Sequence, residues 1–501
     1  MTFFYYRIQL SAPLIICLFG CRLIFIRFFK ARKERFLPPT GLKNVPVVSG
    51  RVPIFGHGLQ MIIFGEINFF RRCYSKYGPI FQIQVYSKTI VIVCENNLVA
   101  ALFKAKPQYF SGRAANSAFG LVFPEAEFQH DFPLGVTYIR KTTNLDKDEV
   151  IGKMSEDTKR AFVELTAGRS EREFSNSWEN ELYRHITKII YSSLCSTMPL
   201  EETLVTQLHA LFDAVHLVIA ATFLVPKWLI PWIFKLRARR LRSYTLKEFE
   251  KRIRTYQKNF TREESVLVNT AIEYAEQRSQ AGLVEEVSQT THAAGLVLGV
   301  LFSSASNVTT ALINTIQFLS MPQHSQILAQ LRQECEGLGQ NADRIVTAPF
   351  LNACIVETAR LSTTFMAATK TPMGEPGTNC LGDYILGEDV DLVAASGPLM
   401  MVYGNSEKYF KNPNKFWPQR FLDKPGGGGE QMTPSYISTW GGGVHLCPGK
   451  NFALYAIKIT LAHLVLNFDF ESIGTVPAVF NYMTPVAFGK RKVKITFKRR
   501  N

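Results

Sequence analysis

The residues best suited to chemistry surround Cys447. This cysteine lies in the run Trp440-Gly441-Gly442-Gly443-Val444-His445-Leu446-Cys447-Pro448-Gly449. Glycine lets a backbone approach a flat ligand closely and adopt positive φ, and a proline suits the start of the apolar helix expected over residues 451–468. A cysteine just before a helix N-terminus faces free N–H donors and the positive end of the helix dipole. Both features favour its thiolate.

A thiolate is a strong axial ligand for haem iron and pushes electron density toward O–O cleavage. We therefore expect Cys447 to bind iron. An ordinary buried cysteine beside a glycine loop is the alternative, and it would be the default for an isolated cysteine. The combination of glycines, His445, Cys447 and Pro448 favours the ligand.

A second candidate feature is Glu357-Thr-Ala-Arg360, whose i,i+3 spacing puts both charges on one helix face. The spacing alone is weak, because Glu181 and Arg184 fit it equally well, and a surface ion pair is the default interpretation. The apolar residues around Glu357 and Arg360 favour a buried pair instead.

A third feature is the stretch 293–313, which is apolar nearly all round and predicts a central buried helix. Small and hydroxyl-bearing residues gather in its middle, where a helix can open locally to admit a ligand. The polar residues of interest are Asn307, Thr309 and Thr310. In the alternative interpretation they only satisfy carbonyls of their own helix.

These motifs together resemble the cytochrome P-450 family of haem-thiolate monooxygenases. The family signature is an aromatic residue, a glycine three positions later, a cysteine seven later and a glycine nine later, and Trp440, Gly443, Cys447 and Gly449 match it. His445 occurs at this position in sterol 14-demethylases and in relatives of cholesterol 7-hydroxylase and prostacyclin synthase. The resemblance implies that His445 contacts a haem propionate and that the loop, Gly441 included, lies against haem b.

The resemblance also assigns residues outside the cysteine loop. Arg420, in the segment 416–421, matches the arginine that completes a buried Glu–Arg–Arg cluster with Glu357 and Arg360. Such a cluster must be fully paired to be tolerated in a core. Lys370 stands where the family often has a propionate-binding arginine. Tyr138 matches a sterol-demethylase tyrosine that contacts a propionate.

The stretch 293–313 resembles the family's long helix over the distal face of the haem, where an acid usually precedes a threonine. Two registers are possible, one placing residues 307–308 at this pair and the other residues 308–309. Neither contains an acid. We expect Asn307, Thr309 and Thr310 to handle oxygen and protons, the protons arriving through water, a substrate hydroxyl or Thr309.

The N-terminal residues predict a membrane anchor. Residues 1–29 contain an apolar run close to the ~20 residues that span a bilayer, and the basic residues that follow favour a cytosolic body. A cleaved signal peptide is the alternative. We expect an anchor at 1–29, a basic and proline-rich hinge at 30–58 and a catalytic domain at 59–501, on the endoplasmic reticulum membrane. Residues 223–234 are a second membrane-facing candidate or a buried core segment.

Composition agrees with a membrane-bound intracellular protein. The 501 residues carry a formal charge of +16 and nine cysteines, none in a CxxC pair, so a disulfide framework is not expected. No nucleic-acid motif accompanies the basic charge. Strand patterns at 80–85, 89–93, 384–402 and 492–498, with helical patterns from 145 to 335, predict a mainly α fold with a smaller β part.

The predicted function is that of a microsomal-type monooxygenase. The resemblance implies molecular oxygen, a lipophilic terpenoid, steroid-like or other secondary-metabolite substrate, and electrons from NADPH through the flavins of a separate NADPH-cytochrome P-450 reductase. The chain resembles a fungal-type biosynthetic member of the family more than a housekeeping demethylase. Two alternatives are an isomerase or dehydratase on the same fold, motivated by the missing acid, and a non-enzymatic membrane protein that binds haem or lipid.

Overall fold

The computed structural model describes most of the chain between residues 41 and 500. The described residues are 41–52, 55–85, 88–106, 108–111, 147–166, 171–195, 198–224, 232–259, 265–282, 288–339, 341–362, 369–375, 378–395, 407, 410–422, 440–441, 446–473 and 494–500. Residues Met1–Lys43 and Asn44–Asn501 form separate units. The expected anchor at 1–29 and the first part of the expected hinge lie outside the described residues, as does most of the segment 223–234.

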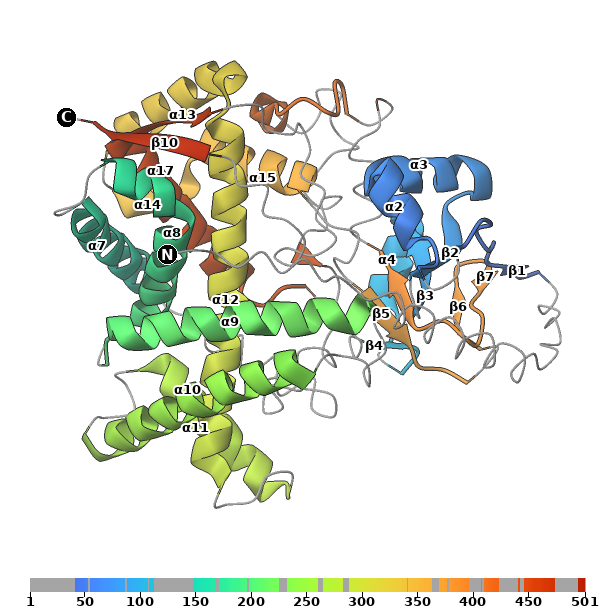
Figure 1. Ribbon diagram of the computed structural model, residues 1–501, viewed down its shortest axis with the longest axis horizontal. Helices are drawn as coiled ribbons and strands as arrows, with labels where there is room; N and C mark the ends of the chain where they lie inside the picture. The colour runs from blue at the N-terminus through green and yellow to red at the C-terminus, as the bar shows by residue number, and fades with distance from the viewer. Residues whose placement is uncertain are drawn as a thin grey trace. The chain divides into compact units, whose positions relative to one another are not determined.

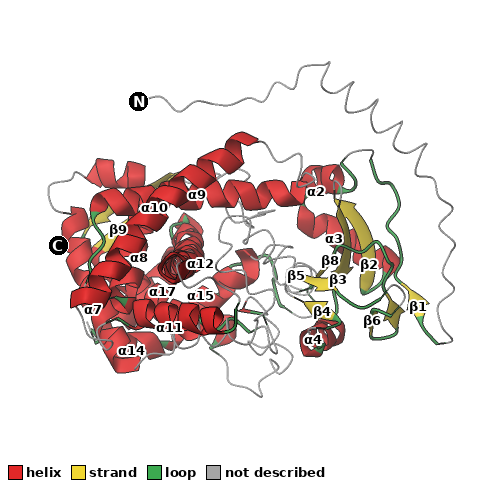
Figure 2. Ribbon diagram, turned by 90° about the horizontal axis from the view of Figure 1, so that it is seen from below, coloured by secondary structure: helices red, strands yellow, loops and turns green. Residues whose placement is uncertain are grey.

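Helix α12 (Gln289–Leu319) is the centre of the helical core. It packs against α8 (Glu171–Leu194), α10 (Trp232–Asn259), α11 (Val266–Gln280), α15 (Pro349–Ser362) and α17 (Lys450–Asn467). Figure 2 shows α12 almost end-on among these helices. Because neighbours cover it on several sides, its apolar residues are buried all round. The predicted central helix is confirmed. Among the described residues, it is the one helix that is long and apolar enough to cross a membrane, and its burial in the core explains this composition.

The remaining helices extend this core. Helix α9 (Glu202–Leu224) lies against α10 and crosses the line of α12 (Figure 1). Further elements are α7 (Lys147–Thr166), η4 (Pro322–His324), α13 (Ser325–Leu338), α14 (Ala342–Thr347) and η5 (Pro418–Phe421). The helical pattern expected from 145 to 335 is therefore confirmed in the described residues.

A two-stranded ladder closes one side of the helical core. Strands β9 (Phe468–Ile473) and β10 (Lys494–Arg499) are antiparallel, with Phe470 opposite Phe497. Alternate side chains of both strands are buried, and β10 lies on α8. The final strand predicted at 492–498 is thus confirmed, beginning at Lys494 in the described part of the chain.

The β part is built around a sheet of order β2-β3-β8-β5-β4. Its strands are Ile80–Val85, Lys88–Val93, Leu392–Ala394, Thr369–Pro372 and Phe110–Ser111 in that order. The strands predicted at 80–85 and 89–93 form the antiparallel β2–β3 pair, whereas β3 and β8 run parallel. Short helices accompany the sheet: α2 (Gly58–Phe64), α3 (Glu66–Tyr77) and α4 (Asn96–Lys104).

Alternation along β2 and β3 buries both faces of this sheet. Phe81 and Ile83 face a cluster that contains residues of α2 and α3, while Ile80 and Val91 face a cluster that contains residues of α4. Smaller strands complete the β part, namely β1 (Lys43–Asn44), β6 (Cys380–Leu381) and β7 (Tyr384–Ile385). The strand pattern predicted at 384–402 is divided between β7 and β8, and residues 396–402 lie outside the described residues.

The second half of the expected hinge is bound to the sheet. The amide of Val48 donates to the carbonyl of Gln82 at 2.9 Å, and the amide of Gln82 donates to the carbonyl of Pro46 at 2.8 Å. Gly56 bridges Val85 with φ +59°, and a Cβ there would lie 2.2 Å from the Gln84 carbonyl oxygen. Glycine is required at this close approach. Residues 46–48 and Gly56 are therefore fixed to the edge of β2.

Two buried histidines make the packing of α7, α8 and α17 sensitive to acid. The rings of His185 and His463 both lie on Phe162, at 5.8 and 6.3 Å between centroids. Neither Nε2 atom has a hydrogen-bond partner among the described residues. Burial lowers the pKa of His185 to about 3 and that of His463 to about 4. Both rings are therefore packed as neutral imidazoles.

We expect the free energy of unfolding to fall as the pH drops below about 6.5, the ordinary histidine pKa. The folded-state pKa values lie below the unfolded value, so protonation favours the unfolded chain, by about 2 kcal/mol per ring at pH 5. His463→Phe should remove about 2 kcal/mol of this loss, because the titrating ring is gone and phenylalanine keeps the stack on Phe162. Urea unfolding at pH 7.5 and pH 5 measures it. The same pH-dependent loss in wild type and variant would contradict the prediction.

Candidate functional site

Cys447 lies directly before the first turn of α17. Its amide donates to the carbonyl of Trp440 at 2.7 Å, which closes the loop between the two residues, and Gly441 has φ +75°. Helix α17 begins at Lys450 with Gly449 as its N-cap residue. The first-turn amides of a helix have no intrahelical acceptor, so Cys447 stands beside N–H donors as predicted. Gly443 and His445 lie outside the described residues.

The exposure of Cys447 separates it from the other described cysteines. Cys447 is half-buried, whereas Cys380 is exposed and the remaining five are buried, namely Cys73, Cys94, Cys195, Cys335 and Cys354. A buried cysteine is inert and an open one is unselective. Cys447 therefore combines partial access with a helix N-terminus, a combination suited to a ligand.

The helix start contributes to the Cys447 thiolate as expected, through the amide of Gly449, but burial of the sulfur acts in the opposite direction and is the larger effect. Burial raises the pKa of the Cys447 thiol, while the amide of Gly449 and the charge of Lys450 lower it by less. Desolvation of the charged form outweighs these two contributions. A bound cation is what deprotonates such a thiol outright.

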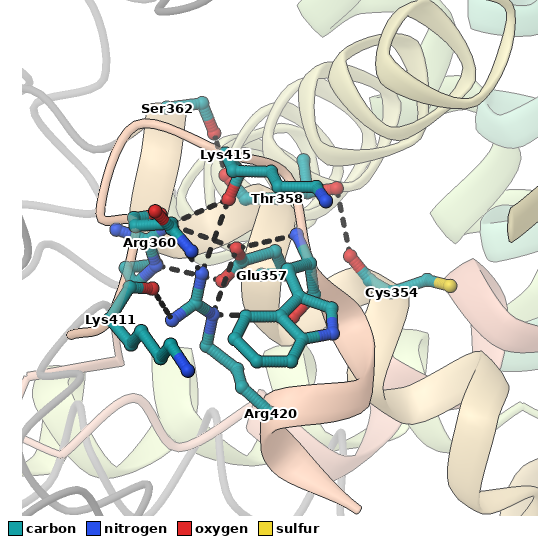
Figure 3. A network of polar contacts seen from close by, with 10 residues as sticks. Cys354, Glu357, Thr358, Arg360, Ser362, Lys411, Lys415 and Arg420 are labelled. Atoms are coloured by element: carbon teal, nitrogen blue, oxygen red, sulfur yellow. Dashed lines mark hydrogen bonds and ion pairs between the residues drawn. The ribbon is translucent and has the colours of Figure 1, made fainter. Parts of the chain in front are cut away.

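Glu357 is the centre of a buried network of charges (Figure 3). Arg360 Nε lies 2.7 Å from Glu357 Oε2, and Arg360 Nη2 lies 2.8 Å from Oε1. Arg420 Nε and the amide of Trp417 also donate to Oε1, at 3.2 and 2.9 Å. Glu357 and Arg360 are almost completely buried. The predicted Glu–Arg–Arg cluster is thus present, with a backbone amide as a fourth partner.

The donors left over on Arg420 hold the segment before η5. Its Nη1 donates to the carbonyl of Lys411 at 2.8 Å, and its Nη2 donates to the carbonyls of Asn412 and Lys415 at 3.2 and 3.3 Å. The ring of Phe410 lies 4.8 Å from the Arg360 guanidinium carbon and 5.7 Å from that of Arg420. The network therefore fixes residues 410–420 against α15.

The second Glu-x-x-Arg motif behaves differently. Arg184 donates to the Thr206 hydroxyl at 2.6 Å and is half-buried. The i,i+3 spacing puts two charges on one face in both motifs, but only packing decides whether they enter a core.

The three polar residues predicted on α12 do not share one face. Asn307 and Ser303 are exposed one turn apart, and Asn307 Nδ2 donates to the Ser303 carbonyl at 2.7 Å. Thr310 donates to the Ser306 carbonyl at 2.8 Å. Thr309 is buried, and its hydroxyl has no hydrogen-bond partner among the described residues. Residues two positions apart on a helix are separated by a rotation of about 200° around its axis, so Asn307 and Thr309 point in nearly opposite directions.

Lys370 is a buried cation on β5. Its side chain is 3% exposed, and its Nζ lies 5.9 Å from the centre of the Phe103 ring. No described residue forms a hydrogen bond or ion pair with it. Burial lowers its pKa to about 7. A buried charge is tolerated only when it is paired with an opposite charge. Tyr138 lies outside the described residues.

Sequence reasoning missed one polar contact to α12. Tyr183 Oη lies 2.9 Å from Ser306 Oγ. Tyr183 belongs to the 181–184 motif discounted above, and its partner is 123 positions away. The small hydroxyl residues in the middle of α12 were the only sequence signal for this contact, and they did not indicate which residue would be the partner.

Neutralising Glu357 should destabilise the folded protein through this cluster. We expect Glu357→Gln to lower the free energy of unfolding by about 3–5 kcal/mol, because two guanidinium groups then lose their buried counter-charge. Glu181→Gln, in the matched motif, should change it by less than about 0.5 kcal/mol. Urea titration of both proteins is the measurement. Equal effects of the two substitutions would rule out a special role for the buried network.

Comparison with known proteins agrees with this arrangement. Residues 46–133 and 136–499 match the sequence model of the cytochrome P450 family. The chain is 26% identical over 474 residues to a probable lanosterol 14-alpha demethylase of Acanthamoeba polyphaga mimivirus, covering 93% of this chain and 64%, less than two thirds, of that protein. It is 24% identical over 518 residues to the lanosterol 14-alpha demethylase of Bos taurus, covering 98% and 95%.

A solved structure supports the fold. Retinoic acid-bound cyanobacterial CYP120A1 aligns with a TM-score of 0.68 at 18% identity, over 92% of this chain and all of that one. The mainly α architecture with a smaller β part is therefore that of this fold, as predicted. Because the family match extends over most of the sequence, this chain belongs to the cytochrome P450 family and is a monooxygenase with a cysteine-ligated haem.

Proposed function

We propose that Cys447 is the iron ligand and that this chain oxidises a lipophilic terpenoid, steroid-like or other secondary-metabolite intermediate. The observation that carries the proposal is the position of Cys447, half-buried beside the open amides of α17. Family membership requires a ligating cysteine, and the described alternatives are buried deeply or lie exposed on β6. The loop residues Trp440, Gly441, Gly443 and Gly449 would lie against the haem.

The described residues fit a haem. The Cys447 thiol would supply the sulfur ligand, and the buried cation of Lys370 would suit a propionate. Tyr138 and His445 are proposed as further propionate contacts. When bound, the haem supplies the chemistry of oxygen activation, which an axial thiolate promotes. The network of Glu357, Arg360 and Arg420 supports the site by fixing the chain before the cysteine loop.

Asn307 is the proposed polar group on the open face of α12. Its Nδ2 is held by the Ser303 carbonyl, which leaves Oδ1 to accept a hydrogen bond from a water or a substrate hydroxyl. An amide cannot supply a proton as an acid does. Thr310 is proposed to assist, although its hydroxyl is bonded to its own helix. Thr309 would take part only if the helix opened.

Two observations support the proposed substrate class, one from this chain and one from its relatives. The apolar surface of α12 suits a lipophilic molecule, and two similar proteins bear the name lanosterol 14-alpha demethylase. We propose a sterol-like or terpenoid skeleton, in a fungal-type biosynthetic role. Electrons would come from NADPH through a separate NADPH-cytochrome P450 reductase, whose acidic surface the net charge of +16 would attract.

We also propose a location for the enzyme. An anchor at 1–29 would hold the chain on the endoplasmic reticulum membrane, with a hinge at 30–58 and the catalytic domain at 59–501 in the cytosol. The apolar run and the basic residues after it support this arrangement. A membrane location would also deliver a lipophilic substrate.

Expression in membranes with the reductase tests the function. Candidate terpenoids and sterols are fed, and products are identified by mass spectrometry. We expect a product heavier by one oxygen, dependent on NADPH. Conversion without NADPH or reductase would instead indicate an isomerase or dehydratase, which the missing acid in α12 would allow.

Cys447→Ala tests the ligand within the same system. We expect it to abolish the thiolate-type absorbance band of the reduced CO complex, because no other described cysteine occupies a comparable position. Cys380→Ala removes an exposed cysteine and is the matched control, which should keep the band. A Cys447→Ala protein with an unchanged spectrum would refute the assignment.

Lys370→Met tests the proposed propionate contact. We expect haem to transfer to an apoprotein acceptor about tenfold faster, since a charged hydrogen bond contributes about 1.5–3 kcal/mol. Lys370→Arg should retain haem. Lys458→Met is the control, because Lys458 is also buried but donates to the Val346 carbonyl at 2.7 Å. Equal haem loss from the Lys370→Met and Lys458→Met proteins would exclude a specific contact.

A further inference from the structure

The hydroxyl of Ser306 differs from those around it on α12. Four hydroxyl residues of this helix donate to the carbonyl four positions back, namely Ser303, Ser304, Thr310 and Thr315. This is the usual way in which a helix satisfies a serine or threonine in its interior. Ser306 is buried but bonds outward, to Tyr183 of α8 at 2.9 Å. Its hydroxyl is therefore committed to a neighbouring helix and not to its own.

Tyr183 connects Ser306 with ionisable groups of α9. Its ring lies 4.4 Å from that of His209 between centroids. Burial raises the pKa of Tyr183, its hydrogen bond to Ser306 opposes this, and the charge of Asp213 raises it further. Asp213 is exposed and His209 half-buried, one helical turn apart. Groups that exchange protons with water thus lie on the outer side of Tyr183.

Ser306 is also next in the chain to the residues of the proposed oxygen site. Ser306 precedes Asn307, and its carbonyl accepts the hydrogen bond from Thr310. The segment carries no carboxylate in either register considered above. A hydroxyl both donates and accepts hydrogen bonds, so two hydroxyls in sequence can pass a proton without either becoming charged for long.

We propose that Tyr183 and Ser306 form a proton relay to the open face of α12, in place of the acidic residue that this helix lacks. The inference rests on the proposed function. A monooxygenase converts RH, O2, two electrons and two protons into ROH and water. NADPH supplies the electrons through the reductase, so the protein must deliver two protons for each turnover.

Each delivery is balanced. The O–H bond of Ser306 breaks as its proton moves inward to water beside Asn307, and Ser306 Oγ takes the proton of Tyr183 Oη. Tyr183 then takes a proton from a water on the α9 side, and the hydroxide left there is neutralised by a proton from bulk solvent. After each delivery, the hydroxyl groups of Tyr183 and Ser306 are both protonated again. The high pKa of Tyr183 keeps it neutral between deliveries.

The test uses the full-length holoenzyme with its reductase in membranes and lanosterol as the probe. Tyr183→Phe and Ser306→Ala each remove one hydroxyl. We expect kcat with NADPH to fall about tenfold or more, as for the loss of a positioned proton donor, with KM unchanged and more hydrogen peroxide released for each NADPH consumed. Oxidation of the probe driven by added hydrogen peroxide should be retained, since peroxide brings its own protons.

Matched variants separate a relay from a structural contact. Ser306→Thr keeps a hydroxyl and should restore NADPH-driven turnover. Tyr191→Phe removes a buried hydroxyl elsewhere on α8, where the ring meets Phe249 at 6.0 Å, and should leave turnover unchanged. Equal losses in the NADPH-driven and peroxide-driven reactions, or normal coupling in Tyr183→Phe, would overturn the relay.

A measurement that does not depend on turnover tests the contact between Tyr183 and Ser306 independently. In protein labelled with 3-fluorotyrosine, the fluorine resonance absent from Tyr183→Phe belongs to Tyr183. We expect it to shift in Ser306→Ala and when CO binds the reduced haem, whereas that of Tyr191 does not. If wild type fails to oxidise lanosterol or any fed candidate, the proposed function fails. A Tyr183 resonance indifferent to Ser306 and to CO overturns the relay whatever the turnover.

Discussion

The buried carboxylate of Glu357 is the constraint on which the haem-side structure depends. An ionised carboxylate in a protein core is very costly unless it is paired and hydrogen-bonded. Here two guanidinium groups and the amide of Trp417 share it, and Arg420 passes the constraint on to three backbone carbonyls. Removal of any one of these charged groups would leave the buried charge of another without its partner. Residues 410–420 are therefore held in one conformation before the chain continues toward Cys447.

Burial shifts the pKa values of two groups of the proposed haem site. Lys370 is a buried cation without a partner among the described residues, and burial raises the pKa of the Cys447 thiol. Burial of the Lys370 ammonium disfavours its charged form, whereas the buried Cys447 thiol stays protonated. In the proposed site, a ligand with a cationic metal and peripheral carboxylates would favour the thiolate and pair the ammonium, and its binding would stabilise the folded state by mass action.

Helix α12 combines a structural and a chemical task. Most of its hydroxyl groups bond back to their own helix, which lets polar residues enter a core at little cost. Ser306 departs from this pattern by bonding to Tyr183, whereas its exposed neighbour Asn307 bonds back to the Ser303 carbonyl. The departure lies in the part of the helix where the family resemblance expects an acid.

The sequence by itself determined the features that depend on neighbours along the chain. Cys447 at a helix start, the shared face of Glu357 and Arg360, the β2–β3 hairpin and the central apolar helix all follow from short spacings or periodicity. Only the tertiary structure decided which groups meet across elements. It bonded Arg420 to Glu357 and Tyr183 to Ser306, left Thr309 buried, and let desolvation outweigh the helix start at Cys447. The physical reason is that local geometry sets the direction of a side chain, whereas packing sets its partners and its contact with water.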